Sequence, residues 1–431
     1  MKVLKKIAAL VIMAITMLTV AACSNNKKNT TSSVNIPKNI TKKTTITFWN
    51  AMVGPLQTNL QELTKEFEKQ NPNIKVKLEY QGSYEDIKSK VQNTLQSPNN
   101  LPTIAQSYAG YLYTAAQGGY LQDMTPYIND TNVGWGSVSK SNINKTLLEG
   151  AQIKGTQYGI PFNKSVEVLY YNKTLLDKYG ISVPKTMSEL KTAAKKIYDK
   201  TNHKVVGAGF DNLSAYYTDG MKEEGYNFNS KINFTGTASK NVIKYYADGI
   251  KRGYFMIAGS QKYLSVPVAN EQVAMYVSAS AGEAYVKKGL NGKFEYGVAN
   301  RPSKYNMARG SDIYMFKHAS SMQKAAAFKY IKFLTSKSSQ LKWANATGYI
   351  PVNNETVNYS AAYKNSTSIK SPAILEQAIK RLYNFPVTKN SETTFNDVSS
   401  ILSGILSQTK TKNVDSLIKT GKAKFDSDWK Q

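Results

Sequence analysis

Side chains that commonly act as nucleophiles or metal ligands are scarce in this chain. Cysteine occurs only as Cys23, and histidine only as His203 and His318. A single cysteine excludes an internal disulfide, and the two histidines alone cannot complete an ordinary zinc site. Cysteine–histidine catalysis is excluded as well, because Cys23 lies in a targeting segment. We therefore expect no metal and no other cofactor, while a histidine general base stays open.

Two carboxylates are better candidates for chemistry on hydroxyl groups. Glu167 shares the strand alternation of Ser165, so both side chains are expected on one face, and Asp312 follows Gly310. Carboxylates accept hydrogen bonds from sugar hydroxyls and repel phosphate. They also form the catalytic pair of glycosidases, about 5 to 9.5 Å apart. An exported carbohydrate hydrolase is therefore one alternative, and acids that face solvent or pair at a hinge are another.

The amino terminus has the three parts of an export signal. Three lysines within the first six residues precede an uncharged apolar run at 7–20, and Val20-Ala21-Ala22-Cys23 resembles a bacterial lipobox. The apolar run is shorter than the roughly 20 residues of a spanning helix. We expect a signal peptide at 1–22, lipidation of Cys23, and a lipid anchor on the extracytoplasmic face of the cell membrane.

The segment 23–44 holds Cys23 and then mainly Asn, Lys, Thr and Ser, which predicts a flexible linker. The net charge is +27, and loss of three lysines with the signal leaves +24. The lysines are scattered rather than clustered with arginine as in nucleic-acid readers, so no nucleic-acid partner is expected. A basic surface adhesin for anionic wall polymer or membrane is a third functional class.

The elements that must position these residues alternate between strands and helices. The chain has 431 residues, and a single core rarely grows beyond roughly 250 to 300 residues, so two lobes are expected. Strand, helix, strand, helix, strand is the order in the first part, which favours an α/β lobe. The expected strands are 45–49, 74–80, 103–108, 166–171 and 312–316; the expected helices are 56–67, 87–95, 187–197 and 325–334; a break is expected at 348–352.

Several short motifs occur in a characteristic order after Thr45. They are Ile46 to Trp49, Asn71-Pro72, Tyr80-Gln81-Gly82-Ser83-Tyr84, Pro161-Phe162-Asn163-Lys164-Ser165, Leu169-Tyr170-Tyr171-Asn172-Lys173 and Thr347-Gly348-Tyr349-Ile350-Pro351. Together with the lipobox, this set resembles family 1 extracellular solute-binding proteins, the ligand-capturing subunits of ABC importers for sugars and polyols. Within that family it is most similar to the glycerol-3-phosphate binding branch.

The resemblance implies an α/β fold of the type II, maltose-binding-protein-like kind, with two lobes and a hinged ligand cleft. Its lobes are discontinuous in sequence, and we place them at 45–155 with 305–350 and at 156–304 with 351–431. It also implies a monomer that captures a small sugar or polyol, delivers it to ABC transporter permease subunits, and catalyses no reaction.

Candidate ligand contacts follow from the motif matches. They are Tyr84, Ser165, Ser280, Gly310 and Tyr349. Each has a structural alternative, which in the same order is a half-buried ring, a turn serine, a helix start, an ordinary turn and a hinge brace.

Aromatic rings near the expected cleft complete the candidate site. Trp49, Tyr108, Tyr111 and Phe210 lie in or beside segments expected there. Flat rings complement the C–H face of a pyranose, although such rings also fill lobe cores.

Two positions depart from the glycerol-3-phosphate branch. Ala109 stands where the branch has a glutamate after the equivalent of Tyr108, and Asn396 aligns with its phosphate-binding arginine. Arginine suits phosphate because its planar donors engage two oxygens at once. We therefore expect a neutral carbohydrate or polyol as the ligand, with glycerol-3-phosphate or a phosphodiester as the alternative.

Overall fold

The computed structural model describes residues 34–259, 263–359 and 369–430. Cys23, the predicted signal peptide and most of the predicted linker lie outside these residues. The chain divides into two units, Met1–Asn35 and Ile36–Gln431, and every described helix and strand belongs to the second. None of the described helices is both long enough and apolar enough to cross a membrane.

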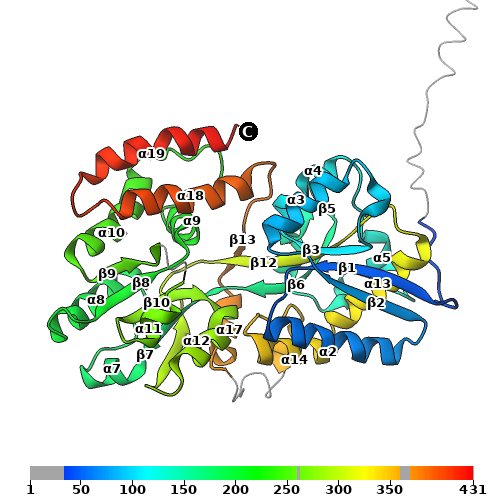
Figure 1. The fold of residues 1–431 in the computed structure, drawn as a ribbon, viewed down its shortest axis with the longest axis horizontal. Coiled ribbons are helices and arrows are strands. Elements are labelled where there is room, and N and C mark those ends of the chain that lie inside the picture. The colour runs from blue at the N-terminus through cyan, green and yellow to red at the C-terminus, as the bar shows by residue number, and fades with distance from the viewer. Residues whose placement is uncertain (1–33, 260–262, 360–368, 431) are drawn as a thin grey trace, which may run out of the picture. The chain divides into compact units, whose positions relative to one another are not determined.

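Two main β-sheets with surrounding helices make up the described part of the chain (Figure 1). The strands of the first sheet are β1 Thr44–Asn50, β2 Ile74–Tyr80, β3 Ile104–Ser107, β6 Gly159–Ser165, β12 Asn306–Met315 and β13 Leu382–Asn384. The strands of the second sheet are β7 Glu167–Asn172, β8 Val206–Phe210, β9 Phe255–Ile257, β10 Val273–Ala279 and β11 Tyr296–Asn300. A separate two-stranded sheet consists of β4 Gln152–Ile153 and β5 Thr156–Gln157.

The helices fall between these strands. The α-helices are α2 Pro55–Gln70, α3 Tyr84–Thr94, α4 Tyr113–Gln117, α5 Thr125–Asn129, α6 Lys145–Gly150, α7 Lys173–Lys178, α8 Met187–Lys200, α9 Leu213–Glu223, α10 Thr237–Arg252, α11 Ser265–Ala269, α12 Glu283–Leu290, α13 Ser321–Leu334, α14 Lys337–Thr347, α15 Asn354–Tyr359, α17 Pro372–Ile379, α18 Ser391–Leu406 and α19 Val414–Asp428. Short 3₁₀ turns are η1 Pro98–Asn100, η2 Ala109–Leu112, η3 Ser139–Ser141 and η5 Ser280–Gly282.

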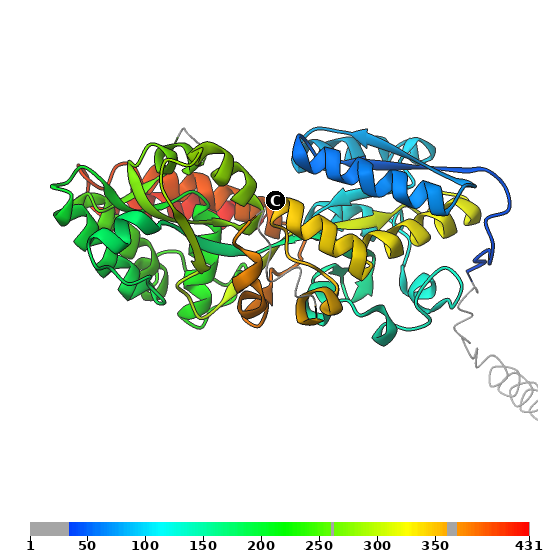
Figure 2. The same cartoon turned by 90° about the horizontal axis from the view of Figure 1, so that it is seen from below.

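The first sheet has the order β13-β12-β3-β1-β2, with β6 paired to β12. β1 runs parallel to β2 and β3, as expected for strands joined by helical crossovers, and β12 runs antiparallel to β3 and β6. Ile46 and Phe48 of β1 are fully buried. α2 buries Leu60, Leu63 and Phe67 at helical spacing, and it packs beside α14 (Figure 2). The predicted strand–helix order of this region is confirmed.

The second sheet has the order β11-β7-β10-β8-β9. β10 is parallel to β8 and antiparallel to β7. Residues Val273 to Val277 of β10 are buried throughout, as expected for a central strand covered on both faces. The helices α18 and α19 lie side by side at the edge of this region (Figure 1). Both sheets therefore have buried cores of their own.

Two short spans of the described chain join a strand of one sheet directly to a strand of the other. Ser165 ends β6 and Glu167 begins β7, while Asn300 ends β11 and Asn306 begins β12. Asn306 ties the spans together: its Oδ1 accepts a hydrogen bond from the Glu167 N–H at 3.1 Å, and its Nδ2 donates to the Glu167 carbonyl at 2.8 Å. These paired hydrogen bonds fix the two passages side by side.

Two strands lie in the first sheet although their residues fall in ranges expected for the second lobe. They are β6 and β13, and both pair with β12. Because β12 is a long strand, it offers edges to partners from distant parts of the chain. The proposed lobe boundaries themselves stay a prediction.

Candidate ligand pocket

A pocket of about 480 Å³ lies where β8 and β10 end. Register pairs Phe210 of β8 with Val277 of β10, so the residues that follow, Asp211 and Ser278, come together at the carboxyl ends of two parallel strands. Ligands of open α/β sheets bind at this kind of edge. The residues around the pocket are Leu56, Asp211, Tyr263, Ser265, Tyr276, Ser278, Ala279, Ala281, Gly282, Tyr285, Val286 and Tyr349.

Tyrosine is the most frequent side chain around this pocket. Tyr263 and Tyr285 are 58% and 47% exposed, whereas Tyr276 is buried. Tyr349 stacks on Trp343, with 6.0 Å between ring centroids and 17° between planes. Burial raises the pKa of Tyr349 and of Tyr276 above its ordinary value, so both phenols stay neutral and act as hydrogen-bond donors and acceptors.

Asp211 is the acidic side chain of the pocket. Its Oδ2 accepts a hydrogen bond from Ser278 Oγ at 3.0 Å. Burial raises the pKa of Asp211 to about 7, although Ser278 and backbone N–H groups oppose the shift. The carboxylate is therefore partly desolvated at the edge of the cavity.

Tyr84 and Tyr108 form an aromatic group of their own, with centroids 4.9 Å apart. The Tyr84 hydroxyl lies 3.1 Å from Ser311 Oγ. Burial and the neighbouring phenols of Tyr349 and Tyr108 raise the pKa of Tyr84. Three of the sequence-predicted residues, Tyr84, Tyr108 and Tyr349, are thus neighbours, and their contact with ligand stays a prediction.

Ser165 and Gly310 lie on the paired strands β6 and β12. Ser165 is opposite Arg309, and Gly310 is opposite Lys164. The sequence placed Gly310 before a strand, but β12 begins at Asn306 and includes it. Its φ is 100°, and a Cβ there would lie 1.9 Å from the Asn163 carbonyl oxygen. Glycine is therefore required by the close approach of the two strands.

Ser280 lies at the start of η5, directly after β10. It is fully buried, and its backbone N–H donates to the Val166 carbonyl at 2.8 Å. Its Oγ has no hydrogen-bond partner among the described residues. Ser280 is not among the lining residues, although its neighbours Ala279 and Ala281 are.

Trp49 and Phe210 lie outside the pocket lining. Trp49 Nε1 donates to Glu79 Oε2 at 2.9 Å, and its ring packs on the core of the first sheet. Phe210 is fully buried, with centroids 4.9 Å from Tyr216 and 5.0 Å from Phe255. Both placements match the expectation that such rings also fill lobe cores.

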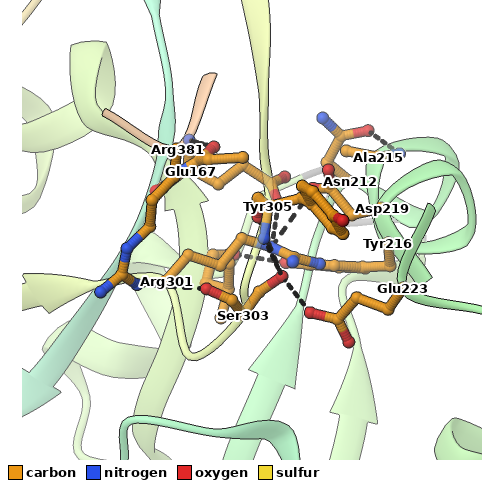
Figure 3. Close-up of polar contacts among 12 residues, drawn as sticks. Glu167, Asn212, Ala215, Tyr216, Asp219, Glu223, Arg301, Ser303, Tyr305 and Arg381 are labelled. Carbon is orange, nitrogen blue, oxygen red and sulfur yellow. Dashed lines mark hydrogen bonds and ion pairs between the residues drawn. The ribbon is translucent and has the colours of Figure 1, made fainter. Parts of the chain in front are cut away.

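Glu167 belongs to a buried ion cluster (Figure 3). Arg301 Nε donates to Glu167 Oε2 at 2.9 Å and lies 3.4 Å from Asp219 Oδ2. The Tyr383 hydroxyl donates to Asp219 at 2.8 Å. Burial raises the pKa of Glu167 to about 8 and also raises that of Asp219. Glu167 is therefore paired with Arg301 next to the passage between the sheets, and its contact with ligand stays a prediction.

Asp312 is paired in the same way. Lys164 Nζ lies 2.5 Å from Asp312 Oδ1, and the Tyr314 hydroxyl donates to Oδ2 at 3.2 Å. Asp312 is 2% exposed. Asp312 is thus paired with a buried lysine of the same sheet, and its contact with ligand stays a prediction.

A third buried pair joins β12 to α18. Arg309 makes two parallel hydrogen bonds of 3.0 Å to the carboxylate of Glu392. Its guanidinium also lies over Tyr108 and Phe395, at 4.7 and 4.4 Å from the ring centroids. Nearby, Asn396 Nδ2 donates to the Tyr111 hydroxyl at 2.8 Å, and that hydroxyl donates to Glu85. Asn396 therefore supports a tyrosine.

The most important residues that the sequence did not reveal are Asp211, Tyr263, Tyr276 and Tyr285. One signal for Asp211 existed, because an acid directly follows the strand at 206–210. Its proximity to Ser278 depends on the pairing of strands about 65 residues apart, which no local pattern encodes.

The chain belongs to the bacterial extracellular solute-binding proteins, whose family model matches residues 62–371. This confirms the resemblance that the motifs carry. Among curated relatives, the sn-glycerol-3-phosphate-binding periplasmic protein UgpB of Shigella dysenteriae is 25% identical over 338 residues, which cover 72% of this chain and 74% of that protein.

Solved structures show the same fold. The GacH receptor of Streptomyces glaucescens, determined unliganded and with acarbose, has a TM-score of 0.75 at 18% identity and covers 90% of this chain and 98% of its own. The ABC substrate-binding protein Lmo0181 of Listeria monocytogenes, in complex with cycloalternan, has a TM-score of 0.74 at 21% identity, with 90% and 99% covered. The predicted two-lobed α/β fold of periplasmic binding proteins is confirmed.

Proposed function

We propose that this protein is the substrate-binding lipoprotein of an ABC importer and captures a carbohydrate or polyol in the pocket beside Asp211. In this proposal the mature chain begins at the lipidated Cys23, acts as a monomer outside the cytoplasmic membrane, and delivers its ligand to permease subunits. The observation that carries the ligand class is the pocket itself: four tyrosines and one carboxylate at the ends of two parallel strands.

The lining suits an uncharged ligand with many hydroxyl groups. Tyrosine rings pack against sugar C–H faces while their hydroxyls bind polar atoms. A volume of about 480 Å³ lies within the range of small-molecule sites, and no described lining residue is basic. Phosphate binding sites usually present arginine or lysine. The pocket therefore supports a neutral carbohydrate or polyol over a phosphorylated one.

Three buried basic residues on or beside β6 and β12 do not change this balance. Lys164 pairs with Asp312, Arg301 with Glu167 and Asp219, and Arg309 with Glu392. A phosphate group would have to displace one of these partners and leave a buried carboxylate without a cation. Such an exchange is unfavourable.

Binding without turnover fits the same pairs. The two acids that a glycosidase mechanism would use, Glu167 and Asp312, are each held by a cation. A nucleophilic carboxylate and a general acid need positions against the scissile bond. Their burial in ion pairs supports capture of the ligand rather than its hydrolysis.

Glycerol-3-phosphate or a phosphodiester is the second candidate, since relatives named for glycerol-3-phosphate align over 72% of this chain. A thermal-shift screen of the purified protein with sugars, polyols and their phosphate esters separates the two. A ligand at 100 times its Kd adds about 2.7 kcal/mol to the free energy of unfolding. We expect a raised melting temperature with a neutral member.

The screen also tests the classes outside transport. Stabilisation by phosphate esters alone would favour the second candidate, and no stabilisation by any member would contradict the proposal. Adding an anionic wall polymer to the panel at low and high salt tests the adhesin class, because binding of such a polymer by surface lysines collapses with ionic strength while capture of a neutral sugar does not.

A further inference from the structure

We infer that Asp211 determines the specificity of the pocket, accepting hydrogen bonds from ligand hydroxyls and excluding anionic ligands. The inference rests on the proposed function and deepens it at one residue. Its basis is the position of this carboxylate, the lack of a salt bridge to it from any described residue, and its free acceptor capacity.

The position of Asp211 is set by the sheet. It is the first residue after β8, and its neighbour across the strands, Ser278, belongs to β10. Both residues line the pocket. Because β8 ends directly before Asp211 and α9 begins two residues after it at the capped Leu213, regular elements on both sides hold the position of the carboxylate.

The electrostatic setting of Asp211 differs from that of three buried acids on or beside β7 and β12. Glu167, Asp312 and Glu392 each form a salt bridge with a buried or half-buried cation. None of the salt bridges among the described residues includes Asp211. An ionised carboxylate that is partly desolvated without a cation is stabilised when a ligand supplies hydrogen-bond donors to it.

Hydrogen-bond capacity at Asp211 exceeds what the protein supplies. An ionised carboxylate offers about four lone-pair positions. Ser278 Oγ occupies one at 3.0 Å, and the backbone N–H groups of Leu264 and Asp211 contribute. A sugar or polyol can supply further hydroxyl donors, whereas a phosphate would bring negative charge next to a carboxylate.

Asp211→Asn is the matched test, because it removes the charge and nearly preserves the shape. Neutral ligands identified in the thermal-shift panel should bind about 10- to 100-fold more weakly, the range for loss of a hydrogen bond to a charged group. The affinity for the corresponding phosphate esters should fall much less. The Kd of the phosphate ester divided by the Kd of the neutral ligand should therefore decrease. Isothermal titration of each ligand pair measures both quantities.

Two further variants keep the test specific. Asp177→Asn changes an exposed acid of α7 that pairs with Lys173, and it should bind like the wild type. Ser278→Ala removes the hydroxyl that orients Asp211. It should lower the affinity for neutral ligands, while the preference for neutral ligands over phosphate esters persists. Thermal unfolding without ligand shows whether each variant is folded.

The pH dependence gives an independent readout. Titratable groups that interact electrostatically with Asp211 are Glu167, Tyr216 and Tyr276, and the phenols stay neutral near pH 7. Affinity of the wild type for a neutral ligand should rise between pH 5 and 8, as Asp211 ionises. Glu167→Gln should keep this rise, and Asp211→Asn should lose it.

Unchanged affinity, selectivity and pH profile in a folded Asp211→Asn protein would overturn the inference and leave the proposed function intact. Failure of the wild type to bind any member of the panel would instead contradict the proposed function, and this inference with it.

Discussion

Gly310 lies where β6 and β12 come closest, so one added carbon should disturb both strands. Its φ is 100°, and a Cβ would lie only 1.9 Å from the Asn163 carbonyl oxygen, which leaves no space for a side chain. We expect Gly310→Ala to lower the free energy of unfolding by more than about 2 kcal/mol, through strain at an unfavourable backbone conformation and steric overlap. Denaturant unfolding measures the change.

Gly404 provides the matched control. It lies in α18, and a Cβ there would meet no atom within 4 Å. Because alanine favours a helix over glycine, Gly404→Ala should stabilise the protein by about 0.5 to 1 kcal/mol. Equal stabilities of the two variants would show that the approach of β6 and β12 is less tight than the structure indicates.

At the residue scale, sequence motifs predicted part of the candidate site. Tyr349 lines the pocket, and Tyr84 and Tyr108 are its neighbours. The motifs could not show that Glu167 and Asp312 contact basic side chains, because their partners Arg301 and Lys164 come close only through the fold. The same limit concealed Asp211.

Element prediction succeeded where local signals are strong. The helix expected at 187–197 is α8, which begins at Met187 directly after its N-cap Thr186. The break expected at 348–352 begins at Gly348, the left-handed residue that caps the end of α14. Three elements start three or more residues earlier than the sequence pattern indicates. α3 begins at Tyr84 because Ser83 and Asp86 form a capping box. α13 begins at Ser321 because Ser320 and Gln323 form a capping box, and β12 begins at Asn306 because its first residues pair with β13.

The passages between the sheets should respond to pH through Glu167. Burial raises its folded-state pKa from 4.5 to about 8, so the folded protein holds a proton that the unfolded chain releases. This contribution to stability is complete below about pH 4.5 and is lost as the pH rises through about 8. We expect Glu167→Gln to flatten the fall in the free energy of unfolding between pH 5 and 8.

Urea unfolding at several pH values checks this expectation. The pKa of Asp219 is also raised, so some of the fall should remain. Glu66→Gln, which changes an acid paired with Lys342 at the surface, should retain the slope of the wild type. If Glu167→Gln left the pH dependence of the free energy of unfolding unchanged, groups other than Glu167 would be responsible for it.

At the scale of the whole molecule, the proposed lipid anchor decides where the protein works. If Cys23 carries the lipid, Cys23→Ala should be exported and recovered in the medium, because a chain without acyl groups has little affinity for the bilayer. Fractionation with a high-salt wash measures this, since the wash removes protein held only by its lysines. Retention of the washed variant in the membrane would contradict lipidation at this residue.

We propose above that the pocket captures a neutral carbohydrate or polyol and leaves it unchanged. Isothermal titration of the purified protein with the neutral ligand found by screening and with glycerol-3-phosphate tests it most directly, with chromatography of the recovered ligand. We predict one neutral ligand bound per protein, recovered intact, and no measurable binding of glycerol-3-phosphate. Micromolar or tighter binding of glycerol-3-phosphate with none of any neutral sugar or polyol would contradict it.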